Sequence, residues 1–228
     1  NNGPLTGSFA GGIVPHAGWF FSGSIACRVI ASLQSDEIIE TVILFGGHMR
    51  PSDKPVFLSS GAVDTPFGTI DVDRGLTAAL ADELDIARMP ADRFPSENTL
   101  ELQYPFIRYF FPKAAIVVGL IPPSGIGISA GQQIGHLAAS RSGHVRVIGS
   151  TDMTHYGPNF GMLAAGTGAK AVEWVTNEND RQAVDALLAM NPEAIILQGL
   201  ENQNMCCSGA AAAAVAACKE NGAVSALE

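Results

Sequence analysis

Side chains able to bind a metal or move a proton follow three short apolar runs of this 228-residue chain. His16 comes directly after "GGIVP", His48 after "TVILFGG", and Asp152 and His155 just beyond "HVRVIGS". Such runs are typical of buried strands, and parallel strands end at one shared edge of their sheet, where ligands bind. We therefore expect the four side chains to converge, although they lie far apart in the sequence.

An anionic donor would complete a metal site. Two neutral imidazoles, one anionic ligand and open positions for substrate form the ligand set of non-haem iron enzymes. Cys206 and Cys207 precede the alanine-rich run "SGAAAAAV". The N-terminus of a helix lowers the pKa of a thiol there, so that the thiolate binds metal or attacks a substrate. The alternative for either cysteine is the packing of a small residue at a helix start.

Other residues of the same types are expected to be structural. His136 lies within an amphipathic helical pattern, and His144 precedes a strand, which places it at the opposite end of the sheet. Cys27 and Cys218 lie on apolar helix faces, where a free cysteine behaves as a small core residue.

Two serines are expected to cap helices. Ser22 precedes apolar residues at helical spacing, and Ser96 precedes a helix whose first turn holds Glu97, with Glu101 one turn on. We interpret both glutamates as solvated residues or as partners of the helix dipole.

Apolar runs alternate with helical patterns along the chain, which predicts an α/β fold with a central, mostly parallel sheet flanked by helices on both faces. A hairpin excursion is expected near 56–73, around a Pro-Phe-Gly turn. The expected strands cover 11–15, 41–46, 114–122 and 144–150. The expected helices cover 22–33, 74–86, 97–110 with a kink or break at Pro105, 126–140, 168–190, 192–200 and 208–219.

Composition narrows the function further. With 47% hydrophobic residues, the chain can bury one large core, so 1–228 is expected to be a single domain. The segment "NGAVSALE" is typical of a strand start, so the domain is expected to lack its last C-terminal strands. The net charge of −9 and the lack of basic stretches exclude nucleic-acid partners. Apolar runs stop well short of the roughly 18 residues of a membrane span, so no membrane partner is expected. The cysteine spacing indicates reduced thiols and a cytoplasmic location.

Five segments occur together in this order: "PHAGWFFSG", "FGGH", "SENTLELQYPF", "STDMTHYG" and "CCSGAAAAAV". The chain from His16 to Val215 thereby resembles the Memo-like family, the AmmeMemoRadiSam system protein B group. The resemblance implies a fold related to the class III extradiol ring-cleavage dioxygenases, with a cysteine in place of their glutamate ligand.

The resemblance also implies roles for individual residues. His16 and His48 match the family's histidine ligands. The family's cysteine ligand begins a Cys-Gly-x-Gly-Pro segment that aligns with 206–210, so Cys206 takes the place of the ligand and Cys207 that of the glycine. Ala210 replaces the proline, which loosens this register.

The resemblance places Asp152 and His155 near the metal. Asn98 and Gln103 stand where relatives often carry histidine, which weakens the expectation of an additional proton relay.

Three hypotheses follow. The first is a metal-dependent redox protein of dioxygenase type, in which His16, His48 and Cys206 hold Fe(II), and His155 and Asp152 are catalytic; copper is the second choice of metal and zinc stays open. The second is a phosphopeptide-binding or protein-binding adaptor that uses the same cleft. The third is a metal-free cysteine hydrolase. The substrate is a small molecule or a peptide, and both a homo-oligomer and functional partners from the AmmeMemoRadiSam system stay open.

Overall fold

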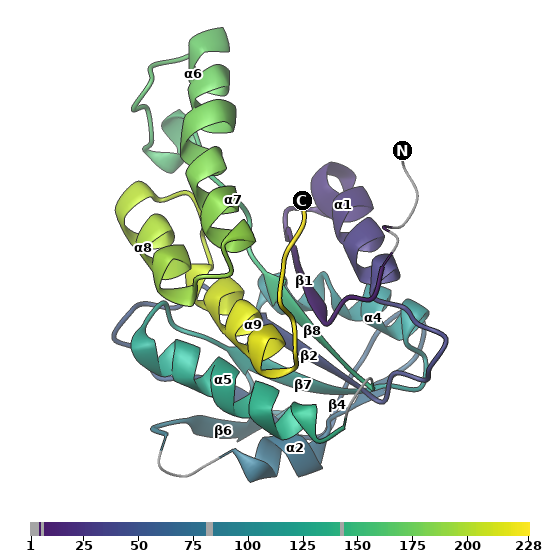
Figure 1. Ribbon diagram of the computed structural model, residues 1–228. Helices are drawn as coiled ribbons and strands as arrows, with labels where there is room; N and C mark the ends of the chain where they lie inside the picture. The colour runs from purple at the N-terminus through teal and green to yellow at the C-terminus, as the bar shows by residue number, and fades with distance from the viewer. Residues whose placement is uncertain (1–4, 6, 81–83, 142–143) are drawn as a thin grey trace.

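The computed structural model describes residues 5, 7–80, 84–141 and 144–228, and their central sheet has the strand order β1-β8-β2-β7-β3-β6 (Figure 1). Strands β1, β8, β2 and β7 are parallel, β3 is antiparallel to β7, and β6 is parallel to β3. The fold is therefore the expected α/β type with a mostly parallel sheet. The strands are β1 (Gly11–Val14), β2 (Thr41–Gly46), β3 (Val56–Ser60), β6 (Ala87–Pro90), β7 (Ala115–Leu120) and β8 (Val145–Ser150).

Helices cover both faces of this sheet, as Figure 1 shows. Val42 and Leu44 of β2 pack in one core cluster with apolar residues of α1 and α4. Ile43 and Phe45 belong to a second cluster, shared with α5 and α9. Alternate residues of one strand thus enter opposite cores. The helices are α1 (Trp19–Ser32), α2 (Arg74–Ala79), α3 (Asn98–Glu101), α4 (Tyr104–Phe110), α5 (Gly125–Ala139), α6 (Ala169–Trp174), α7 (Asp180–Leu188), α8 (Pro192–Asn202) and α9 (Ser208–Glu220).

The alanine-rich helix α9 lies unusually close to its neighbour α5. A Cβ atom at Gly131 would meet the Ala213 carbonyl oxygen at 2.4 Å, and one at Gly135 would meet the Ala217 Cα at 2.6 Å. Small residues on both helices permit this approach, and the alanine run is buried on every side. Helix α9 is therefore a fixed support for the cysteines at its start.

Helices α6, α7 and α8 form an outer unit that packs on α9. A π-helical segment, Val175–Asn179, joins α6 to α7. Its last residue, Asn179, donates to Thr154 Oγ1 at 3.0 Å, and Asp180 accepts from the Thr154 backbone N at 3.1 Å. The long helical unit thus holds the loop that follows β8.

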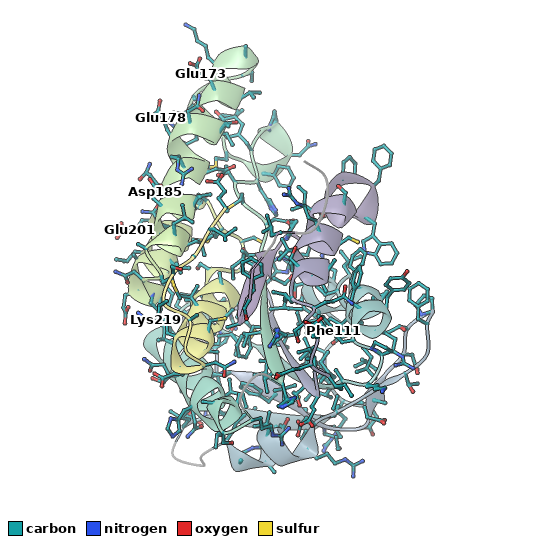
Figure 2. The ribbon with its side chains drawn as sticks, turned by 45° about the vertical axis from the view of Figure 1, so that its right-hand side comes forward. Phe111, Glu173, Glu178, Asp185, Glu201 and Lys219 are labelled. Atoms are coloured by element: carbon teal, nitrogen blue, oxygen red, sulfur yellow. The ribbon has the colours of Figure 1, made fainter. Side chains whose placement is uncertain are left out.

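Acidic side chains line the outer side of this unit. Figure 2 shows Glu173, Glu178, Asp185 and Glu201 along it. No helix in the described ranges is long and apolar enough to cross a membrane.

Two strand predictions need correction. The excursion expected near 56–73 is a narrower hairpin, β4 (Ala62–Val63) with β5 (Ile70–Asp71), because β3 pairs with β7 in the main sheet instead. The segment 221–228, expected to be the start of a strand, is not part of a strand in the structure. Residues 223–228 have no regular structure, and no strand of the described chain pairs with them.

Both helix-cap predictions are also wrong. Helix α1 begins at Trp19, and Ser22 lies inside it, where its hydroxyl donates to the Ala17 carbonyl at 2.8 Å. Glu97 caps α3 with its own carboxylate, while the Ser96 hydroxyl donates to Glu101 Oε1 at 2.5 Å.

Three expected helices differ in extent. The helix expected over 97–110 is split into α3 and α4 ahead of Pro105, as a proline near the start of the second helix predicts. That expected over 74–86 ends at Ala79, because Leu80 leaves the helical conformation; 81–83 lie outside the described residues. The helix expected over 168–190 contains the π-helical segment.

Candidate metal centre

The carboxyl ends of three neighbouring strands bring the predicted residues together. His16 follows β1, Asp152 and His155 follow β8, and His48 follows β2, in a sheet where β8 lies between β1 and β2. The turn that delivers His48 depends on Gly47, whose φ of +101° favours glycine. The convergence expected from the strand ends is therefore observed.

His16 is buried, and both of its ring nitrogens have partners. Nδ1 lies 3.1 Å from the Ser150 hydroxyl, while Nε2 lies 3.2 Å from the Cys206 sulfur. The residue is only 3% exposed. The serine contact fixes the ring so that Nε2 is directed at the sulfur.

His48 is half exposed and is oriented by a carboxylate. Its Nδ1 lies 3.1 Å from Glu97 Oε1, and its ring centroid lies 5.3 Å from that of His16. A hydrogen bond with the Cys206 thiolate raises the pKa of His48 to about 9; burial opposes this shift and Glu97 adds to it. His48 is thus an imidazole held between an acid and a sulfur.

Cys206 is fastened to the end of β8 through its backbone and its sulfur. Its N–H donates to the Asp152 carbonyl at 3.1 Å, and the Asp152 N–H donates to the Cys206 sulfur at 3.3 Å. The pKa of Cys206 lies well below that of an ordinary thiol. A hydrogen bond with Cys207 is the main cause, and contacts with both imidazoles add to it, so that together they outweigh burial.

Four potential metal donors meet at this point. One ligand atom each from His16, His48, Cys206 and Cys207 lie within 4.8 Å of one another. Imidazole nitrogen and thiolate sulfur are donors that transition metals prefer. The donor set therefore fits a metal ion, and a site for one is the arrangement's simplest chemical explanation.

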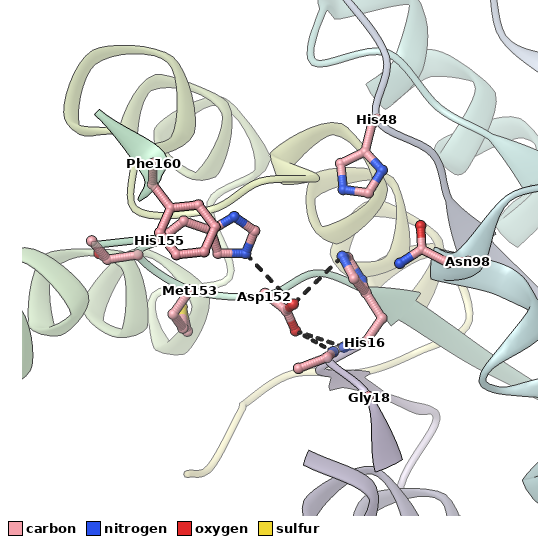
Figure 3. Close-up of a pocket in the computed structure, with 10 residues that line it drawn as sticks. His16, Gly18, His48, Asn98, Asp152, Met153, His155 and Phe160 are labelled. Carbon is pink, nitrogen blue, oxygen red and sulfur yellow. Dashed lines mark hydrogen bonds and ion pairs between the residues drawn. The ribbon is translucent and has the colours of Figure 1, made fainter. Parts of the chain in front are cut away.

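Asp152 lies beside this cluster and joins it to His155 (Figure 3). Its Oδ1 accepts from the backbone N of His16 at 2.6 Å and of Ala17 at 3.1 Å. Its Oδ2 lies 3.6 Å from His155 Nε2 and 3.8 Å from His16 Nε2. His155 itself lies outside the four-residue donor cluster, with its side chain 41% exposed.

An open cavity of about 490 Å³ lies over these groups. Its size suits a small molecule or a short peptide segment. The ring of Phe160 lies 5.0 Å from that of His155 and forms one wall. The lining residues are His16, Ala17, Gly18, His48, Asn98, Asp152, Met153, Thr154, His155 and Phe160.

One site residue was misjudged from the sequence. Glu97 was expected to be a solvated residue or a partner of the helix dipole; it caps the start of α3, and its carboxylate also contacts His48, a role that was not expected. A glutamate that follows a serine at a helix start is common, so the local spacing does not indicate that Glu97 has a role in the site. Its contact with His48 depends on the tertiary fold. Gln103 was expected to stand where relatives often carry a histidine. It is buried, and its side-chain amide donates to the carbonyl of Pro15, which precedes His16, at 2.9 Å.

The residues expected to be structural do not join the cluster. His136 is on α5, and His144 Nδ1 contacts the Ile38 carbonyl at 3.0 Å before β8 begins. Cys218 is buried in the core, and Cys27 is half-buried on α1.

Comparison with known proteins gives one consistent result. Residues 6–226 match the family described as Memo-like protein. A MEMO1 family protein of Methanothermobacter thermautotrophicus is 31% identical, with 96% of this chain and 77% of the relative covered. Another, of Thermococcus onnurineus, is 31% identical over 78% of this chain, and a third, of Caldivirga maquilingensis, is 28% identical over 79%. The matches span only 63% and 60% of these last two relatives.

Proposed function

Since the chain belongs to the Memo-like protein family, we propose that it is a metal-dependent redox protein of dioxygenase type. His16, His48 and Cys206 would hold the metal, and the cavity above them would admit a small-molecule or peptide substrate. The observation that supports this most is the convergence of imidazole and thiolate donors from three separate chain segments.

Fe(II) is the first choice of metal and copper the second. Two imidazoles and a single thiolate leave coordination positions open toward the cavity, as non-haem iron enzymes require, and a thiolate also suits copper. When bound, either metal supplies a one-electron redox couple. Ring-cleaving dioxygenases use a carboxylate where this site offers a sulfur, so cleavage of a catechol is not part of the proposal.

The protein's own groups would handle protons. His155 faces the cavity and is exposed enough to exchange protons with a substrate or with solvent. Asp152 lies within 3.6 Å of its Nε2 and orients the ring. His155 is thus the proposed acid and base, and Asp152 its orienting partner.

The contacts of the thiol favour this proposal over a metal-free cysteine hydrolase. A hydrolase of the kind considered would pair a cysteine with His155 and Asp152. The Cys206 sulfur instead lies beside His16 Nε2, and a hydrogen bond with His48 also lowers the pKa of the Cys206 thiol. An adaptor for phosphopeptides would need clustered arginines, whereas the charged or titratable residues that line the cavity are three histidines and one aspartate.

Elemental analysis after anaerobic purification tests the proposal. The wild type should carry stoichiometric iron or copper, and a His16→Ala/His48→Ala variant should carry none. The matched control is His136→Ala/His144→Ala, which removes two histidines outside the cluster and should keep the metal. A wild type that is free of metal and resists reconstitution would refute the proposal.

A further inference from the structure

We propose that Cys207 is a second sulfur ligand, so that the centre is a site of two nitrogens and two sulfurs. This inference rests on the proposed metal site and revises its ligand set: a fourth protein ligand fills a position that three ligands would leave open, and it moves the preferred metal from Fe(II) to copper or zinc. The resemblance assigned Cys207 only the place of a glycine, whereas its sulfur belongs to the same group of donor atoms as His16, His48 and Cys206.

The spacing of the two sulfurs matches a shared metal. Cys206 and Cys207 Sγ lie 3.7 Å apart. Two thiolates bound to one tetrahedral ion, at a metal–sulfur distance of about 2.3 Å, lie about 3.8 Å apart. All other distances between the four ligand atoms are at most 4.8 Å. Small side-chain movements would therefore place all four around one ion.

The backbone holds Cys207 in this position. Its N–H donates to Thr151 Oγ1 at 3.0 Å, and the residue immediately precedes α9. Gly209 lets α9 approach the end of β7 closely, because a Cβ there would meet the Ile121 carbonyl oxygen at 2.5 Å. The Cys207 residue is buried, with its sulfur within 4.8 Å of the ligand atoms of His16, His48 and Cys206.

The backbone itself does not require a glycine at this position. Cys207 has a φ of −127°, which any residue adopts. The position therefore does not demand a glycine, and the cysteine present adds a fourth potential donor to the cluster, as a four-coordinate ion requires.

The second sulfur defines the class of ion. Two thiolates with two imidazoles favour soft or borderline ions, Cu(I) and Zn²⁺, over Fe(II). Cys206 is already a thiolate, whereas Cys207 loses its thiol proton to solvent as its bond to the metal forms, so uptake of the metal releases a proton. Copper would keep the redox role proposed above, whereas zinc would not.

X-ray absorption on the Zn²⁺-loaded protein tests the inference, because it counts sulfur neighbours without any activity. Wild type should show two sulfurs per zinc, and Cys207→Ala should show one. Its Zn²⁺ affinity should fall by more than the roughly 10–100-fold that follows loss of an outer hydrogen-bond partner. Cys27→Ala is the matched control, since it removes a thiol on α1 and should keep two sulfurs and full affinity.

The outcomes separate this inference from the proposed function. One sulfur per zinc in the wild type, with an unchanged count in Cys207→Ala, would overturn the inference and leave the metal site of His16, His48 and Cys206 intact. No stoichiometric binding of Zn²⁺, copper or iron by the wild type would overturn both. The wild-type count decides the question even if the Cys207→Ala variant fails to fold.

Discussion

Polar clusters occur at both ends of the parallel strands, and they differ in kind. At the amino ends, Asp73 accepts from Thr41 Oγ1 at 2.7 Å and from the Leu76 N–H at 3.0 Å, and it pairs with Arg141. At the carboxyl ends, two imidazoles and two thiols approach one another, with Asp152 and Glu97 behind them.

The difference shows how a stabilising cluster is told from a candidate site. At the amino ends both carboxylate oxygens of Asp73 accept hydrogen bonds from neighbouring donors, so the polar groups of this cluster satisfy one another. At the carboxyl ends four potential metal donors lie within 4.8 Å of one another, a grouping that a bound metal ion would hold together. Burial alone would not have separated the two ends.

Cys206→Ser should have the largest effect on metal binding. It replaces a thiolate with a neutral hydroxyl, so metal affinity should fall by at least about 100-fold, while the free energy of unfolding of the metal-free protein changes little. Competition with a chelator of known affinity measures the first quantity, and urea unfolding the second. Unaltered affinity would mean that the two ends of the sheet do not differ as described.

Glu97→Gln should have a smaller effect on the same quantity. The amide keeps the size of the side chain but loses the charge that orients His48, so metal affinity should fall by about 10-fold or somewhat more. The same titration applies, with Glu101→Gln as the matched control on α3. Equal losses in both variants would indicate damage to the helix rather than to the position of His48.

His155→Ala should leave the metal content unchanged while reducing turnover. Loss of an acid and base group costs about 10²–10⁴-fold in rate. Oxygen consumption with a reductant, measured beside elemental analysis, checks both quantities. If this variant loses its metal, His155 is a ligand; if it keeps full turnover, it has no role in proton transfer.

Asp73→Asn should act on stability alone. Burial favours the neutral form of Asp73, but bonds from Leu76, Thr41 and Arg141 outweigh burial and lower its pKa below the ordinary 3.8. Its stabilising contribution is thus present above about pH 4 and is lost as the pH falls through the lower folded value. The variant should unfold about 2–3 kcal/mol more easily at neutral pH, lose less stability on acidification, and bind metal normally. Urea titrations at several pH values test this.

The sequence was sufficient where a local pattern carries the information. Apolar runs ending in His16, His48 and Asp152 identified the strands, and parallel strands share an edge, so convergence followed without knowledge of the strand order. The alanine run likewise predicted α9, although not that glycines of α5 would bury it completely.

Contacts between distant segments were not accessible in this way. Glu97 meets His48 across 49 positions, and the Cys206 sulfur meets His16 across 190. Caps were also misjudged, because Glu97 itself competes with Ser96 for the helix start and glycine precedes α1. The formation of a short strand such as β6 depends on pairing with a neighbouring strand, here β3, rather than on the residue pattern of the strand itself.

The π-helical segment before α7 limits which deletions this part of the chain can accept. Such a turn carries one residue more than an α-helical turn, and removing that residue would rotate the preceding helix relative to α7 by about 100°. Asn179 and Asp180, which hold Thr154 beside His155, lie at this junction. A relative that lacks the extra residue would therefore have to hold the loop after β8 by other contacts, so length variation here would be coupled to changes near the cavity.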